Sequence, residues 1–70
     1  MLTIGEAMKK ARLDKGFSIM QLSIKAGIGK HNIYHWENGV TFPSIINLIP
    51  IADALNISLD ELVGRTVAKR

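Results

Sequence analysis

Apolar and polar positions alternate along the first fifteen residues with the period of an α-helix. Ile4, Met8 and Ala11 recur at intervals of three and four residues, whereas the basic residues between them fall largely on other faces. The pattern predicts an amphipathic helix over residues 3–15. Gly16 ends it, because glycine enters the left-handed conformation of a helix cap at little cost.

Two short helices are predicted next, each with a boundary signal of its own. Ser18 and Gln21 have the spacing of a capping box, in which each side chain bonds the backbone N–H of the other residue. The helix that they begin is expected to end near Ala26, before Gly27. A third helix follows after only two more residues and is predicted over residues 30–38. Two short helices joined by a tight glycine-containing turn are typical of a helix-turn-helix unit.

The remaining apolar positions predict two more helices, and therefore an all-α fold of five helices. Ser44 is placed to cap the fourth helix. Pro50 lies inside this helix and removes one backbone hydrogen bond, so we expect a kink in the preceding turn. Ser58 and Glu61 have the spacing of a second capping box, and the fifth helix is expected to end at Gly64.

Length and charge bound the organisation of the chain. We expect one domain over residues 1–64 and a short basic tail over residues 65–70. A chain of 70 residues buries a smaller fraction of its surface than an average domain does, so we expect a homodimer. Residues 1–35 hold six Lys/Arg and two Asp/Glu, whereas residues 36–64 hold four Asp/Glu and no Lys/Arg. The first half of the domain therefore suits a polyanion.

The chain lacks the residues that several classes of function require. The chain has no cysteine, which excludes disulfides and thiolate metal sites. No apolar stretch reaches the ~18 residues of a membrane span, so we expect a soluble, cytoplasmic protein that is neither exported nor bound to a membrane. No carboxylate pair, activated nucleophile or phosphate-binding glycine loop is present. We therefore expect no enzyme, no cofactor and no small-molecule substrate.

Several spaced motifs stand out along the predicted helices. They are Asp14-Lys15-Gly16-Phe17-Ser18, Ala26-Gly27-Ile28, the run from Ile33 to Gly39, Pro43-Ser44, and the run from Ala52 to Leu62. Together with Ile4-Gly5-Glu6 they span most of the chain. In these motifs the chain resembles the phage-repressor (Cro-type, or xenobiotic-response-element) helix-turn-helix family. The resemblance implies a five-helix, repressor-like DNA-binding domain, with the third helix in the major groove of double-stranded DNA.

The third helix is expected to carry the contacts with DNA bases. It can bury Ile33 and Trp36, which leaves long donor and stacking side chains pointing away from the core. By the resemblance, Lys30 and His31 occupy the positions that read bases first, and His35 follows one turn later. Because lysine donates to guanine O6 or N7, a half-site containing G is expected.

Four further residues are expected to make secondary contacts or contacts with the DNA backbone. They are Gly29, Asn32, Tyr34 and Asn38. Gly29 replaces the serine or threonine that usually caps this helix in the family, and the capping hydroxyl is lost. The resemblance also implies a buried, structural pair between Arg12 and Glu37, which ties the first helix to the end of the third.

Plainer interpretations of these residues stay open. His31 and His35 have the spacing of a metal-binding pair, although neither cysteine nor a suitably placed glutamate accompanies them. Tyr34 suits a solvated helix position, and Trp36 suits the core better than a contact. The remaining basic residues suit either a solvated surface or contacts with phosphate: Lys9, Lys10, Lys15 and Lys25.

The leading hypothesis is a transcriptional regulator, a repressor that acts as a dimer on a palindromic operator and is associated with the nucleoid when bound. One departure from the family favours an alternative. Most relatives carry glutamine after the capping Ser18, whereas Ile19 and Met20 follow here. If exposed, these two residues suit a protein-contacting patch. The alternative is therefore an antitoxin-like or adaptor module whose main contact is a protein partner.

Overall fold

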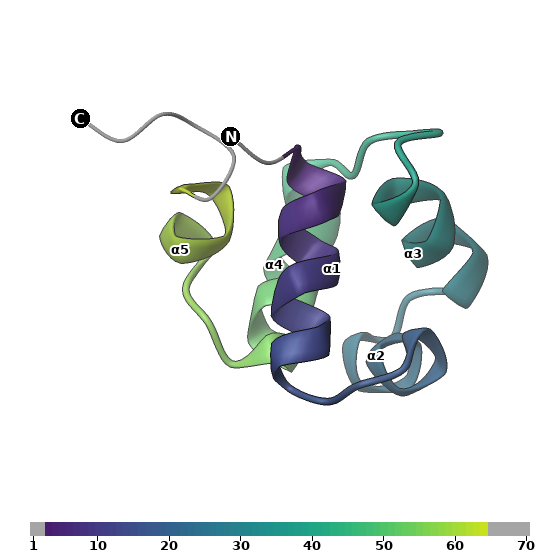
Figure 1. Ribbon diagram of the computed structural model, residues 1–70, viewed down its shortest axis with the longest axis horizontal. Helices are drawn as coiled ribbons and strands as arrows, with labels where there is room; N and C mark the ends of the chain where they lie inside the picture. The colour runs from purple at the N-terminus through teal and green to yellow at the C-terminus, as the bar shows by residue number, and fades with distance from the viewer. Residues whose placement is uncertain (1–2, 65–70) are drawn as a thin grey trace.

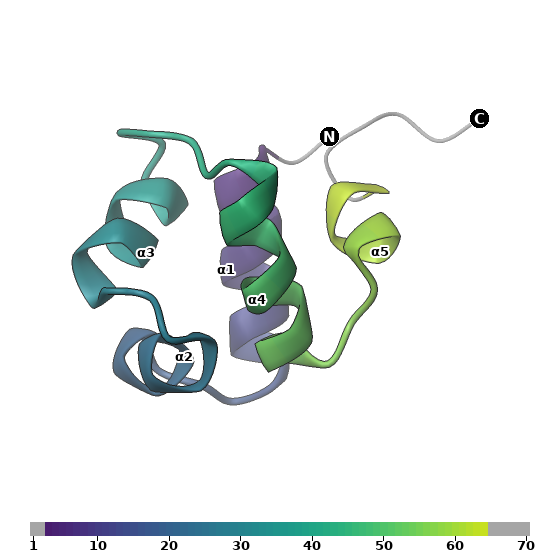
Figure 2. The ribbon, with the colours of Figure 1, turned by 180° about the vertical axis from the view of Figure 1, so that it is seen from behind.

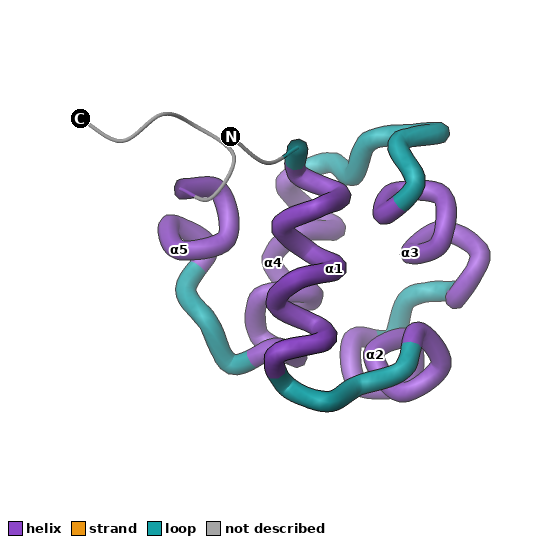
Figure 3. Tube along the Cα trace, viewed as in Figure 1, coloured by secondary structure: helices purple, strands orange, loops and turns teal. Residues whose placement is uncertain are grey.

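The computed structural model describes residues 3–64, and this part of the chain consists of five helices joined by short loops (Figures 1 and 3). In chain order they are α1 (Ile4–Asp14), α2 (Ile19–Ala26), α3 (Lys30–Glu37), α4 (Ile45–Leu55) and α5 (Leu59–Gly64). No strand occurs within residues 3–64, so the predicted all-α class with five helices is confirmed. The basic tail predicted over residues 65–70 lies outside the described residues.

Local signals set the ends of α1. The Glu6 N–H donates to Thr3 Oγ1 (3.1 Å) and the Thr3 N–H donates to Glu6 Oε1 (2.8 Å), which makes a capping box. The sequence pattern predicted Thr3 as the first helical residue, but in the structure Thr3 is the cap and the helix begins at Ile4. Gly16, which follows the C-terminal cap, has a φ of +75°, as expected for a glycine that ends a helix.

The predicted boundaries of α2 are confirmed. The Gln21 N–H donates to Ser18 Oγ (3.1 Å), and the Ser18 N–H donates to Gln21 Oε1 (2.8 Å). Gly27 ends the helix in the left-handed conformation with a φ of +69°. After this turn α3 begins at Lys30, so α2 and α3 form the predicted helix-turn-helix unit (Figure 1).

Ser44 is the N-terminal cap residue of α4, as predicted, but the capping hydrogen bond expected of its side chain is absent. Its carbonyl oxygen already accepts from the N–H groups of Asn47 (3.0 Å) and Leu48 (2.9 Å), so the donor that the hydroxyl would have satisfied is in use. At the next boundary, in contrast, the Glu61 N–H donates to Ser58 Oγ (2.9 Å), as expected at the start of α5.

Pro50 lies inside α4, which is one continuous helix from Ile45 to Leu55 (Figure 2). Proline has no N–H, so it cannot donate to the carbonyl of Ile46 one turn earlier. The Ile46 side chain is 76% exposed, which places this turn at the solvent, where water can bond the free carbonyl. The expected kink stays a prediction.

The core lies where the helices meet around α1. α1 stands between α3 and α5 and packs against both, α2 packs against α3 and α4, and α4 also packs against α5 (Figures 1 and 2). Each helix contributes at least one buried apolar side chain, and the largest fully buried ones are Met8, Leu22, Ile33, Ile51, Leu55 and Leu62. None of the helices in residues 3–64 has the length and apolar character needed to cross a membrane.

Candidate nucleic-acid interface

One face of α3 is open to solvent and carries polar side chains. Ile33 and Trp36 are buried in the core, as predicted. The four side chains on the other side of the helix are exposed: Lys30, His31, Tyr34 and His35. At 100° per residue they span about 140° of the helix surface, a width that suits insertion into a groove. α3 therefore presents a continuous row of hydrogen-bond donors and aromatic rings.

The start of α3 is sterically open. Gly29 is the cap residue and makes no side-chain capping bond. A Cβ added to Gly29 would meet only the Asn32 side-chain nitrogen, at 3.8 Å. The first N–H groups of a helix lack partners within the helix and carry partial positive charge, so they attract anions such as phosphate. The sequence prediction of a backbone contact near Gly29 and Asn32 is compatible with this geometry.

The turn between α2 and α3 is held by hydrogen bonds from a single residue. Ser23 Oγ donates to the carbonyl of Ile28 (2.6 Å). The Ser23 carbonyl in turn accepts from the N–H groups of Gly27 (2.9 Å) and Ile28 (3.2 Å). These bonds fix where α3 begins relative to α2.

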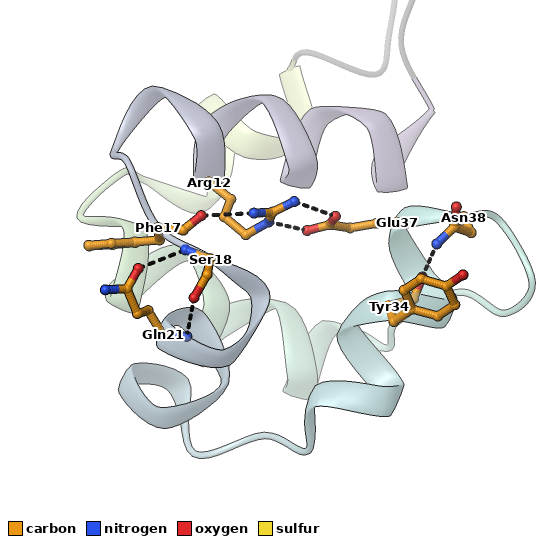
Figure 4. A network of polar contacts seen from close by, with 7 residues as sticks. All are labelled: Arg12, Phe17, Ser18, Gln21, Tyr34, Glu37 and Asn38. Atoms are coloured by element: carbon orange, nitrogen blue, oxygen red, sulfur yellow. Dashed lines mark hydrogen bonds and ion pairs between the residues drawn. The ribbon is translucent and has the colours of Figure 1, made fainter.

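The other end of α3 is tied to α1 by an ion pair (Figure 4). Arg12 Nε donates to Glu37 Oε2 (2.8 Å) and Nη2 donates to Oε1 (3.0 Å), while Nη1 donates to the carbonyl of Phe17 (2.8 Å). The two side chains are only 8% and 3% exposed. In a bidentate ion pair of this kind the attraction between the two charges offsets the cost of their desolvation. The structure thus brings together the two residues that the resemblance paired.

A second contact between α1 and α3 joins their backbones and was not predicted from the sequence. A Cβ added to Gly5 would lie 2.0 Å from the carbonyl oxygen of Trp36 and 3.1 Å from the Cα of Glu37. Only glycine therefore permits this approach of the two helices. A glycine in the first turn of a predicted helix is a signal of such a contact, because it otherwise costs about 1 kcal/mol relative to alanine.

Two of the expected secondary contacts have intramolecular partners. The Asn38 side-chain nitrogen donates to the carbonyl of Tyr34 (2.8 Å) at the end of α3 (Figure 4). The Tyr34 ring lies 6.0 Å from the His35 ring, with 58° between the planes. The exposed Tyr34 ring is thus positioned beside His35 on the outer face.

Three of the other basic residues lie on the surface of α1 or have a contact of their own. Lys9 and Lys10 line a shallow hollow on the outer surface of α1 together with Glu6 and Asp14, whose charges offset theirs. The Lys25 ammonium lies 5.1 Å from the centre of the Phe17 ring, a cation–π contact. These surroundings favour the solvated-surface interpretation of the three lysines.

The predicted protein-contacting pair at the start of α2 is reduced to one residue. Met20 is 48% exposed, whereas Ile19 is partly buried and packs against the core. The metal interpretation of His31 and His35 gains no third ligand, because residues 3–64 hold no group of three or more His, Cys, Asp or Glu placed to bind a metal ion.

Three comparisons with known proteins agree on the type of domain. The chain is 44% identical over 45 residues to the cryptic phage CTXphi transcriptional repressor RstR of Vibrio cholerae, an alignment that covers 64% of this chain and 40% of RstR. It is 27% identical over 64 residues to the HTH-type transcriptional regulator ImmR of Bacillus subtilis, covering 91% of this chain and 50% of ImmR. The chain thus spans half or less of the curated relatives that it matches.

A solved structure extends the likeness to three dimensions. The biofilm-formation regulator SinR of Bacillus subtilis, crystallised in complex with DNA, has a TM-score of 0.82 and 34% sequence identity, covering 87% of this chain and 98% of that one. The family model described as a helix-turn-helix domain matches residues 5–66. The chain belongs to the phage-repressor (Cro-type, or xenobiotic-response-element) helix-turn-helix family.

Proposed function

We propose that this domain binds double-stranded DNA sequence-specifically through α3 and acts as a transcriptional regulator. The observation that carries the proposal is the outer face of α3, which combines exposed donors and rings with a backbone held at both ends. A rigid helix with donors at its start is the feature that reads base edges in the major groove. The names of RstR as a phage repressor and of SinR as a DNA-bound regulator support the same function.

Within this proposal, Lys30, His31 and His35 contact bases. Lys30 and His31 are the first two residues of α3, and His35 lies one turn further along the exposed side. Tyr34 lies between them and contacts sugar, phosphate or a thymine methyl group. The open start of α3 at Gly29 receives a backbone phosphate.

The finer form of the proposal is a repressor that acts in the cytoplasm as a homodimer on a palindromic operator. A two-fold protein requires a two-fold site, so half-sites about one helical turn apart are expected. Asn32 and Asn38 complete the contacts with the DNA backbone at the two ends of α3.

Selection of bound duplexes from a randomised DNA library, followed by a salt titration on the enriched site, tests this proposal. We expect an enriched palindrome and an affinity that falls steeply as salt rises, because lysine–phosphate contacts release counterions. A Lys30→Ala variant should bind with relaxed preference at one base pair of each half-site, a loss of about 1–3 kcal/mol of discrimination. Lys10→Ala is the matched control, since Lys10 lies on the outer surface of α1, and it should keep the preference of the parent.

A second candidate function has one observation in its favour. Met20 and Ile24 are 48% and 73% exposed, and they lie one turn apart on α2. Such a pair suits the docking of a protein partner, as in the antitoxin-like or adaptor hypothesis. If the library yields no enriched sequence and only weak binding that salt abolishes, this second function replaces the first.

A further inference from the structure

Most of the large apolar side chains that are exposed in the described chain lie in one short segment. Nine large apolar side chains are exposed among residues 3–64, and five of them lie in the α3–α4 loop and the first turns of α4. We call these five the α4 patch: Val40, Phe42, Ile45, Ile46 and Ile49. Scattered exposed apolar residues need no explanation, but five within ten consecutive residues indicate an interaction surface.

α4 itself carries apolar residues on two sides. Leu48, Ile51, Ala52 and Leu55 are buried against the rest of the domain. At 100° per residue, Ile45, Ile49 and Ile46 fall within an arc of about 100° outside the buried side. Figure 2 shows α4 in front of α1, with no helix covering its near side. A helix that is apolar on both sides is normally buried on both sides, so the fold of one chain leaves α4 half covered.

The charge pattern indicates what covers it. Residues 38–52 contain no Lys, Arg, Asp or Glu. In a two-fold symmetric interface each surface meets its own copy, so any net charge in the patch would face the same charge. A neutral apolar surface avoids this repulsion. The basic surface of residues 1–35 and the acidic residues from Asp53 onward would each face a like charge in the second copy. The patch is therefore the surface best suited to a second copy of this chain.

The size of the patch is sufficient for such a contact. With exposed fractions of 49 to 76%, the five side chains present an area on the order of 600 Å². Complete burial of the patch in both copies removes on the order of 1,200 Å², which is the lower end of the range of stable interfaces.

The patch is also connected directly to the candidate DNA-binding helix. The Val40 N–H donates to the carbonyl of His35 (2.9 Å), so the loop that carries Val40 and Phe42 is bonded to the end of α3. A second copy that docks here fixes the position of one α3 relative to the other. We propose that the α4 patch is the surface through which two copies of this chain form a two-fold dimer. This inference rests on the homodimer of the proposed function and assigns its interface.

Sedimentation equilibrium of the chain without DNA tests the assignment, with the parent, Ile46→Glu and Ile24→Glu compared side by side. Ile46 and Ile24 are 76% and 73% exposed, so neither substitution should disturb the packing within the single folded chain. We expect a dimer for the parent and for Ile24→Glu, the matched control outside the patch. For Ile46→Glu we expect the dissociation constant to rise more than about 30-fold, because two added carboxylates then face each other in an apolar interface.

Two results would overturn the assignment: a parent that stays monomeric with or without operator DNA, and an Ile46→Glu variant that dimerises as tightly as the parent. Binding of the uncharged Ile46→Gln variant to a duplex with a single half-site separates this inference from the proposed function. If Ile46→Glu is monomeric but Ile46→Gln and the parent bind no specific duplex, the interface stands and the DNA-binding function fails. If specific half-site binding is found but Ile46→Glu remains dimeric, the function stands and the interface is wrong.

Discussion

Removal of Glu37 should destabilise the domain far more than removal of both members of its ion pair. In Glu37→Ala the Arg12 guanidinium stays in a site where its side chain is only 8% exposed, and two of its three hydrogen bonds are lost. An uncompensated buried charge costs about 3–5 kcal/mol. A domain of this size has only about 3–5 kcal/mol of stability, so Glu37→Ala should be largely unfolded at 25 °C.

The double variant Arg12→Met/Glu37→Met leaves no buried charge. It still loses the bond from Arg12 Nη1 to the carbonyl of Phe17, and an unsatisfied buried carbonyl costs about 1–3 kcal/mol. Apolar replacement of a buried pair recovers part of that loss. We therefore expect the free energy of unfolding of the double variant to lie within about 2 kcal/mol of the parent value and well above the value of either single variant. This corresponds to a large coupling energy between the two positions.

Urea denaturation followed by tryptophan fluorescence measures these differences. Trp36 is the one tryptophan of the chain and is 5% exposed, so its emission reports on the packing between α3 and the core. The midpoints should rank parent, then double variant, then single variants. A Glu37→Ala variant that unfolds like the parent would refute the burial argument. A double variant as unstable as Glu37→Ala would show that packing, and not uncompensated charge, causes the loss.

Two glycine substitutions test the backbone geometry around α3. Gly5→Ala forces a Cβ against the Trp36 carbonyl, and the cost of overpacking should exceed the gain of about 1 kcal/mol in helix propensity, so thermal melting should show a free energy of unfolding lower by about 2 kcal/mol. Gly29→Ala places its Cβ near no close atom, and its free energy of unfolding should stay within about 1 kcal/mol of the parent. Equal melting temperatures for the parent and both variants would contradict the contact at Gly5. Gly27→Ala should lower the free energy of unfolding, measured by urea titration, by about 1 kcal/mol, because Gly27 has a φ of +69° although the space around it is open. An unchanged midpoint would show that the turn relaxes.

Both ends of α2 were predictable from the sequence because their signals are local. The Ser18–Gln21 capping box and Gly27 act within a few residues, so their spacing alone predicted both ends of α2. Ser44 shows the limit of this reasoning, since its own carbonyl takes the N–H of Asn47 that the hydroxyl was expected to bind. A preferred residue type at a cap position does not determine which of its two oxygens accepts the bond.

For the candidate site, helical periodicity predicted which side of α3 is exposed but not how α3 is held. Ile33 and Trp36 fall on one side by spacing, which left the outward positions to the polar residues. The contact between Gly5 and the Trp36 backbone joins positions far apart in the chain, and no local pattern encodes its distance. The cation–π contact of Lys25 with Phe17 depends on tertiary packing in the same way.

On the proposed function, the hydrogen bonds at the start of α3 and the two contacts at its end affect which DNA sequences the domain selects. Ser23 holds the turn before the helix, while Gly5 and Arg12 of α1 hold its last residues. A recognition helix fixed in this way has little freedom to tilt or slide toward an imperfect groove. Adjustment then falls to the DNA, whose bending and twisting cost depends on base steps that the protein does not touch. We therefore expect part of the sequence preference of this domain to reside in uncontacted base pairs between the half-sites.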